Sequence, residues 1–150
     1  MTSLKVLIVD DNKLLCWGMG RMLEKRNIAH QVAEDGKNAL SKLRETFYDL
    51  VFLDIHLPDA NGLDLMQEIR RISPGAKVVI ISSDGSEDNV RRALAAGALR
   101  FMEKPFDNAE VMTAVAAVLP CQPPPSSSPR GEGKLTPVRI SGSDSAGTDT

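Results

Sequence analysis

Five short apolar runs alternate with five stretches of helical spacing, and this alternation constrains the fold more than any other feature of the chain. Three of the runs are nearly continuous, as expected of strands that are buried on both faces of a parallel sheet. The other two are shorter or weaker. The expected strands cover residues 4–9, 29–33, 49–53, 77–81 and 99–102.

Between these runs, apolar residues recur at three- and four-residue spacing, which predicts amphipathic helices. The expected helices cover residues 12–26, 37–46, 62–72, 86–96 and 108–119. Regular alternation of strands and helices predicts a parallel sheet with helices on both faces and right-handed crossovers. Five such units match the α/β flavodoxin-like doubly wound (βα)5 fold, a three-layer sandwich with strand order 2-1-3-4-5.

The composition divides the chain near Pro120. Six of the nine prolines fall in residues 120–150, and no aromatic residue does. A segment with so little apolar surface cannot offset its chain entropy. We therefore expect one domain over residues 1–119, followed by a disordered Pro/Ser/Gly-rich tail or linker over 120–150.

Charge and cysteine usage exclude several classes of protein. The net charge is −2 without a basic stripe, which argues against direct nucleic-acid binding. No apolar run approaches the ~20 residues that cross a bilayer, and the N-terminus lacks the features of a signal peptide. Cys16 and Cys121 lie far apart and form no metal-binding or disulfide pattern, so a cytoplasmic location fits best.

Polar residues follow four of the expected strands: Asp10 and Asp11, Asp54, Ser82, and Lys104. In this fold these strand ends share one edge of the sheet, at the point where ligands bind. Clustered carboxylates repel one another unless a cation intervenes, and hard oxygen ligands suit Mg²⁺, or Mn²⁺. One carboxylate could then attack a phosphoryl group, with the amine and the hydroxyl on the phosphoryl oxygens.

In these features the chain resembles the receiver domains of two-component response regulators, over roughly residues 4–119. Each motif alone is weak, but all of them occur in order and on the expected strand ends. The motifs are Asp10-Asp11, residues 54–62 from Asp54 to Gly62, Ser82, Gly97-Ala98 and residues 101–106.

The resemblance implies a role for each acidic position. Asp54 would be the phospho-acceptor. Asp11 would bind the metal directly, and Asp10 would support it through water. The backbone carbonyl of His56 would be a further metal ligand.

The resemblance also implies a switch. Ser82 and Lys104 would contact the phosphoryl group, and Ser82 stands where Thr is commoner. Phe101 would be the aromatic residue that turns inward when Ser82 moves, although it lacks the hydroxyl of the Tyr often found there. The peptide bond between Lys104 and Pro105 is usually cis in this family.

Partners follow from the same resemblance. The phosphoryl donor would be a phosphohistidine on a sensor histidine kinase or a histidine phosphotransfer protein. Phosphorylation would change the surface of the fourth helix, fifth strand and fifth helix, which a downstream target reads, and a homodimer is possible. The chain would promote its own phosphorylation and dephosphorylation without being a turnover enzyme.

Three alternatives stay open. The chain could be the receiver fragment of a larger regulator whose effector is missing, or a phosphate-independent interaction module. It could also be a haloacid-dehalogenase-type phosphatase, which uses an aspartyl nucleophile. Those enzymes need a second acid two residues on, where this sequence has His56, and this counts against the third alternative.

The first expected helix is unusually apolar. A stripe through Leu15, Met19 and Met22 can face the sheet, but Leu14 and Trp17 do not both fit on it. We expect them to be exposed and hypothesise that they contribute to docking of the kinase. The alternatives are a partly buried tryptophan with a helical C-terminal neighbour, or an adaptation to crystal or dimer contacts.

Two polar residues beside the expected site have a separate hypothetical role. His56 and Asp84 lie two residues past Asp54 and Ser82. Together they could tune hydrolysis of the aspartyl phosphate. The alternative for His56 is a solvent-exposed residue on the rim, whose backbone alone matters.

Overall fold

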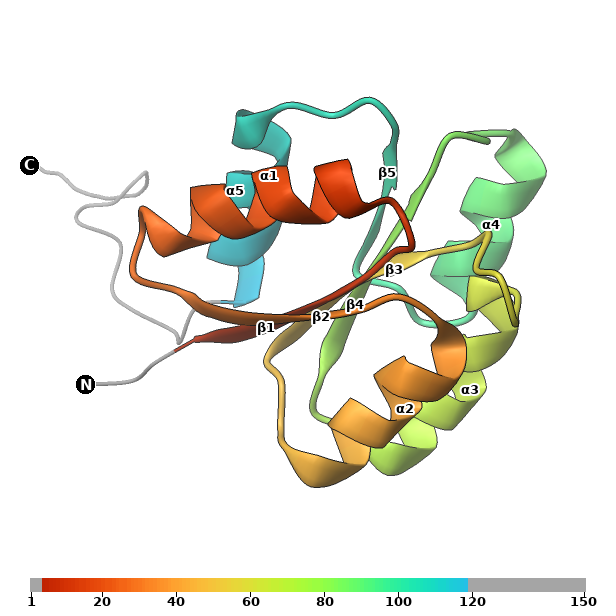
Figure 1. Ribbon diagram of the computed structural model, residues 1–150. Coiled ribbons are helices and arrows are strands. Elements are labelled where there is room, and N and C mark those ends of the chain that lie inside the picture. The colour runs from red at the N-terminus through yellow and green to blue at the C-terminus, as the bar shows by residue number, and fades with distance from the viewer. Residues whose placement is uncertain (1–3, 119–150) are drawn as a thin grey trace, which may run out of the picture. The chain divides into compact units, whose positions relative to one another are not determined.

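The computed structural model describes residues 4–118, and these form a single five-stranded parallel sheet (Figure 1). The strand order is β2-β1-β3-β4-β5, and every neighbouring pair is parallel. The strands are β1 (Lys5–Val9), β2 (Ala29–Ala33), β3 (Leu50–Asp54), β4 (Lys77–Ser82) and β5 (Arg100–Glu103). This topology confirms the predicted order.

Five helices cover the sheet in two layers (Figure 1). Helices α1 and α5 pack on one face, and α2, α3 and α4 pack on the other, which confirms the predicted three-layer sandwich. The helices are α1 (Lys13–Glu24), α2 (Gly36–Glu45), α3 (Gly62–Ile72), α4 (Glu87–Ala95) and α5 (Asn108–Val118).

All five helices begin where a polar side chain caps the first turn. In α5, the N–H of Glu110 donates to Oδ1 of Asp107 at 2.9 Å. Asn12, Asp35, Asn61 and Ser86 each accept a hydrogen bond from a backbone N–H of the helix that follows. These residues have non-helical backbone and satisfy N–H groups that have no partner within the helix. For this reason α1 and α4 start one residue later than the apolar spacing predicts, at Lys13 and Glu87.

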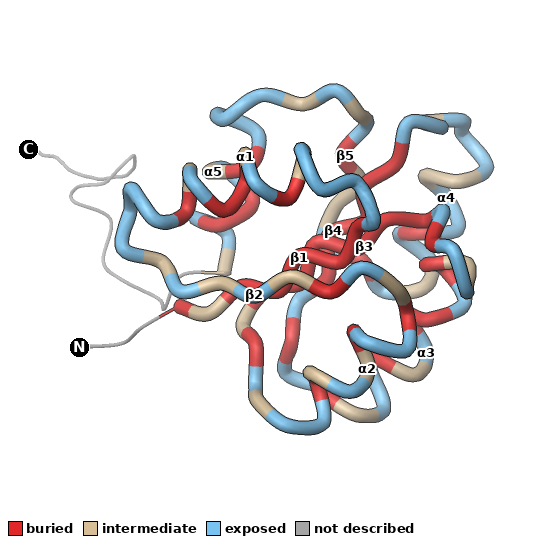
Figure 2. The backbone as a smooth tube through the Cα atoms, in the orientation of Figure 1, coloured by how far each residue is buried: buried red, intermediate tan, exposed pale blue. Residues whose placement is uncertain are grey.

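The core lies on both sides of the central strands, which are almost completely buried (Figure 2). The buried face of α1 differs from the predicted stripe. It is centred on Cys16, Met19 and Leu23, whereas Leu15 and Met22 are only half-buried. The predicted exposure of Leu14 and Trp17 is confirmed.

Two further expectations concern the tail and membrane-spanning segments. The predicted tail or linker over residues 120–150 lies outside the described residues. Within residues 4–118, none of the helices has the length and apolar character needed to span a bilayer.

Candidate functional site

Side chains from four strand ends meet at the carboxyl edge of the sheet. One carboxylate oxygen from each of Asp10, Asp11 and Asp54 lies within 4.8 Å of the others. Asp10, Asp54 and Ser82 are buried, whereas Asp11 is exposed. Lys104 follows the end of β5 and reaches across to the two buried carboxylates. The structure therefore brings together the side chains of four of the five residues. Ser82, the fifth, is buried at the end of β4, the strand that neighbours β3.

Gly62 allows the loop after β3 to fold tightly over the strand end. Its N–H donates to the carbonyl of Ile55 at 2.7 Å, and a methyl group at this position would collide with the backbone carbonyl oxygen of Asp54. Asn61 then caps α3 through the N–H of Leu63 at 2.8 Å. The first turn of α3 thus packs directly against the backbone of Asp54.

Lys104 balances part of the negative charge. Its Nζ lies 2.8 Å from Oδ2 of Asp10 and 3.5 Å from Oδ2 of Asp54. Burial alone would lower the pKa of Lys104, but the charges of the two carboxylates outweigh burial and raise it. The lysine therefore stays charged, and one ammonium faces two buried carboxylates.

The carboxyl group of Asp54 has an unusual environment. Burial, and next the charge of Asp10, raise its pKa above the usual range, and Lys104 offsets only part of this. The N–H of His56 donates to its Oδ1 at 3.3 Å. The backbone and Lys104 thus hold the two oxygens of Asp54 from different sides.

The donor set suits a divalent cation. Oδ2 of Asp10 is buried and accepts no hydrogen bond of good geometry, although it is paired in charge with Lys104. Three carboxylates face one ammonium, which leaves an excess of negative charge. Oxygen ligands of this kind fit Mg²⁺, which binds one or two carboxylates and keeps several waters. These residues could hold such an ion.

The remaining predicted residues lie around this cluster. Phe101 is half-buried and packs against the core under α2, α3 and α4. The side chain of His56 is exposed. The bond between Lys104 and Pro105 is cis. Below the site, the Sγ of Cys16 donates to the carbonyl of Asp10 at 3.3 Å, and burial raises the pKa of this thiol to about 12. The thiol is therefore protonated and serves packing.

Sequence reasoning missed Asp59, which lies in the same loop as His56. Its carboxylate accepts hydrogen bonds from the first N–H groups of α2, more than twenty residues earlier in the chain. An acidic residue in a loop carries no signal of this contact. Only the placement of α2 beside the loop reveals it.

The geometry of this cluster agrees with a known family pattern. The pattern of the response regulator receiver domain matches residues 6–116. The chain belongs to this family. The receiver domain is 35% identical to the chemotaxis protein CheY of Thermotoga maritima over 116 residues, which is 76% of this chain and 96% of that protein.

Solved structures agree with this assignment. A CheY-like receiver domain protein of Methanospirillum hungatei superposes with a TM-score of 0.74 and 26% identity, covering 77% of this chain and 93% of the other. The structure of the CheX-CheY-BeF3-Mg complex of Borrelia burgdorferi gives a TM-score of 0.71 and 33% identity, covering 77% and 88%. The described residues therefore have the fold of CheY-like receiver domains.

Proposed function

We propose that this chain is a phospho-accepting receiver of a two-component phosphorelay, in which Asp54 takes a phosphoryl group from a phosphohistidine. The convergence of Asp10, Asp11, Asp54, Ser82 and Lys104 on one sheet edge carries this proposal. The similarity to a CheY that forms a complex with BeF3 and Mg supports it. Asp10, Asp11, Asp54 and the backbone carbonyl of His56 would hold Mg²⁺.

In the reaction, a carboxylate oxygen of Asp54 forms a bond to phosphorus while the bond from phosphorus to the donor imidazole breaks. The electron pair of that bond stays on the ring nitrogen. When bound, Mg²⁺ neutralises charge on the phosphoryl oxygens. Lys104 turns from Asp10 towards the phosphoryl group and contributes a fixed positive charge, which stabilises the transition state.

Ser82 would couple the phosphoryl group to α4. Its Oγ accepts a hydrogen bond from the N–H of Asp84 at 3.0 Å, so its proton is available to a phosphoryl oxygen. Asp84 in turn accepts from the N–H of Ser86 at 3.2 Å, and its carbonyl accepts from the side chain of Asn89 at 3.1 Å. Movement of the hydroxyl would therefore carry the loop and the start of α4 with it, while Phe101 fills the vacated space.

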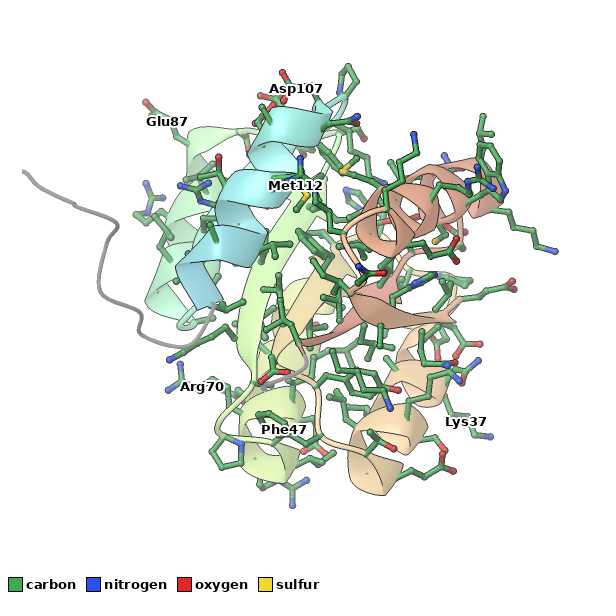
Figure 3. The ribbon with its side chains drawn as sticks, turned by 90° about the vertical axis from the view of Figure 1, so that its left-hand side faces the viewer. Lys37, Phe47, Arg70, Glu87, Asp107 and Met112 are labelled. Carbon is green, nitrogen blue, oxygen red and sulfur yellow. The ribbon has the colours of Figure 1, made fainter. Side chains whose placement is uncertain are left out.

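A partner would read the change on the face formed by α4, β5 and α5. Figure 3 shows this face, with Met112 of α5 and Asp107, just before α5, in front and Glu87 of α4 beside them. Val90 and Leu94 line a largely apolar groove of about 670 Å³ along α4. A downstream protein or a second copy of the chain could bind here, and phosphorylation would shift the population that does so.

The donor would dock on the outer side of α1. Leu14 and Trp17 are 77% and 64% exposed, and Arg21 stacks on the Trp17 ring at 5.7 Å. A groove of about 460 Å³ runs past Trp17 and Arg21 and reaches Asp10. Beside them, Gly18 has no atom within 4 Å of where its Cβ would be, so another helix could approach the backbone closely. This arrangement suits a helical donor.

The proposal includes the role of the whole chain. It acts in the cytoplasm, binds no nucleic acid itself, and works as a switch without turnover of a separate substrate. Phosphorylation of Asp54 distinguishes two of the alternatives, the receiver fragment and the phosphate-independent module. A receiver fragment of a larger regulator is still phosphorylated on Asp54, whereas a phosphate-independent module is not.

Beryllofluoride, which mimics a phosphoryl group, tests the switch. Added with Mg²⁺, it should shift the NMR signals of α4, β5 and α5 in the wild type, because Ser82 is drawn towards Asp54. The matched Asp54→Asn chain should show no shift. Signals that change only beside the carboxylates, and leave α4 unchanged, would contradict the proposed coupling.

A further inference from the structure

Asp59 ties the loop after β3 to the start of α2. Its Oδ1 accepts from the N–H of Gly36 at 2.8 Å, and its Oδ2 accepts from the N–H of Lys37 at 3.1 Å. Both N–H groups belong to the first turn of α2 and have no acceptor within the helix. The loop carboxylate therefore completes a cap that Asp35 begins by accepting from the N–H of Asn38 at 2.7 Å.

The packing around this contact is unusually close. A methyl group on Gly36 would lie 3.3 Å from Oδ1 of Asp59 and 3.3 Å from the Cβ of Ala60. It would also lie 2.8 Å from a methyl group of Leu65 in α3. Glycine at this position lets the loop and α3 approach α2, which runs beside α3 on the same face of the sheet (Figure 1).

The loop itself is a small closed unit. The N–H of Leu57 donates to the carbonyl of Ala60 at 3.2 Å, and a second bond closes the loop between Gly62 and Ile55 at 2.7 Å. His56 lies inside this unit and pairs with Asn61 in an isolated antiparallel bridge. A displacement of Asp59 would therefore displace the backbone of His56 as well.

The contact is electrostatically favourable. Hydrogen bonds from the N–H groups of Gly36 and Lys37 lower the pKa of Asp59, so its carboxylate is charged at neutral pH. A negative charge at a helix N-terminus also interacts favourably with the helix dipole. Asp59 is not one of the three clustered carboxylates.

From these contacts we infer that Asp59 is a positioning residue for the phosphorylation site. By anchoring the loop on α2, it holds the backbone carbonyl of His56 where a metal beside Asp54 would need it. This inference rests on the proposed function, which assigns that carbonyl to Mg²⁺. Asp59 would thus act on the site from outside it, through the backbone of the loop.

Two variants of the full chain separate this role from a simple helix cap. Asp59→Ala and Asp35→Ala each remove one carboxylate from the start of α2, so both should lower the free energy of unfolding. Only Asp59→Ala should weaken binding of Mg²⁺, measured by calorimetry with the metal alone. We expect a loss of roughly tenfold, the lower end for residues that orient metal ligands. Asp35→Ala should bind as the wild type does.

Amide hydrogen exchange without metal gives a second readout. The N–H groups of Leu57 and Gly62 should exchange faster in Asp59→Ala than in the wild type. In Asp35→Ala they should exchange at the wild-type rate. If the wild type binds Mg²⁺ and both variants match it in affinity and exchange, the inference is wrong and the proposed function stands. If the wild type binds no Mg²⁺, the proposed function is wrong and the inference falls with it.

Discussion

The ammonium of Lys104 lies 2.8 Å from the buried Oδ2 of Asp10, closer than it lies to Asp54. Before phosphorylation, then, Lys104 mainly neutralises Asp10. Lys104→Met would leave that carboxylate buried without a counter-charge, and we expect a loss of about 3 kcal/mol in the free energy of unfolding without metal. Urea unfolding measures this loss.

Mg²⁺ should restore part of that loss, because a bound cation replaces the missing charge and binds only the folded state. The exposed Lys77 provides the control, since Lys77→Met should change stability by less than about 0.5 kcal/mol. Equal losses in the two variants would show that the pair with Asp10 contributes little.

Asp54 should destabilise the metal-free protein at neutral pH. Its pKa is raised in the folded state, so the folded chain binds more protons than the unfolded chain between the ordinary carboxyl pKa and the raised one. The free energy of unfolding therefore falls as pH rises through that window. Asp54→Asn should therefore be more stable than the wild type at neutral pH, and the difference should shrink towards acid pH.

Urea unfolding in chelator, at a series of pH values, checks this prediction. Asp11→Asn is the matched control, because Asp11 belongs to the same cluster but is exposed, so its removal should have a smaller effect. A wild type that is as stable as Asp54→Asn at neutral pH would show that Lys104 compensates the buried charge fully.

The sequence predicts most of the sheet and the site because both depend on local patterns. Continuous apolar runs mark strands buried on two faces, and parallel strands bring their carboxyl ends to one edge whatever the loops do. Asp10, Asp54 and Lys104 therefore converge as the order of strands requires. The start of α1 is less predictable from apolar spacing, because the cap at Asn12 sets the residue at which the helix begins.

Contacts between distant segments could not be predicted in this way. Asp59 binds the start of α2, and the guanidinium of Arg70 donates to the carbonyl of Ala96 at 3.0 Å and fills the space above Gly97. Such contacts depend on how loops approach helices in three dimensions. Residue type and spacing alone do not encode them.

The two glycines within α1 should respond oppositely to alanine. Gly18→Ala should stabilise the chain by about 1 kcal/mol, because alanine favours helix and its methyl group meets no atom within 4 Å. Gly20→Ala should destabilise it by roughly 1–3 kcal/mol, because its methyl group would lie 2.6 Å from Nε2 of His30. Thermal unfolding of both variants decides this, and a stabilised Gly20→Ala would show that His30 moves freely.

The outer side of α1 should matter for the natural donor and not for a small one. Trp17→Ala should slow phosphoryl transfer from the cognate histidine donor by roughly tenfold, as expected for an exposed aromatic at the centre of an interface. Phosphorylation by acetyl phosphate should be unchanged. Phe47, also exposed at 54%, precedes β3 at the other edge of the sheet, so Phe47→Ala is the control. If Trp17→Ala receives the phosphoryl group from the cognate donor as fast as Phe47→Ala and the wild type do, docking through Trp17 is excluded.

The central claim is that Asp54 accepts a phosphoryl group with the help of a divalent cation. Intact-mass spectrometry of the purified chain after incubation with acetyl phosphate tests it most directly. We predict a mass gain of one phosphoryl group in the wild type with Mg²⁺, none when the metal is chelated, and none in Asp54→Asn with Mg²⁺. An equal gain in wild type and Asp54→Asn, or no gain in the wild type with Mg²⁺, would contradict the account.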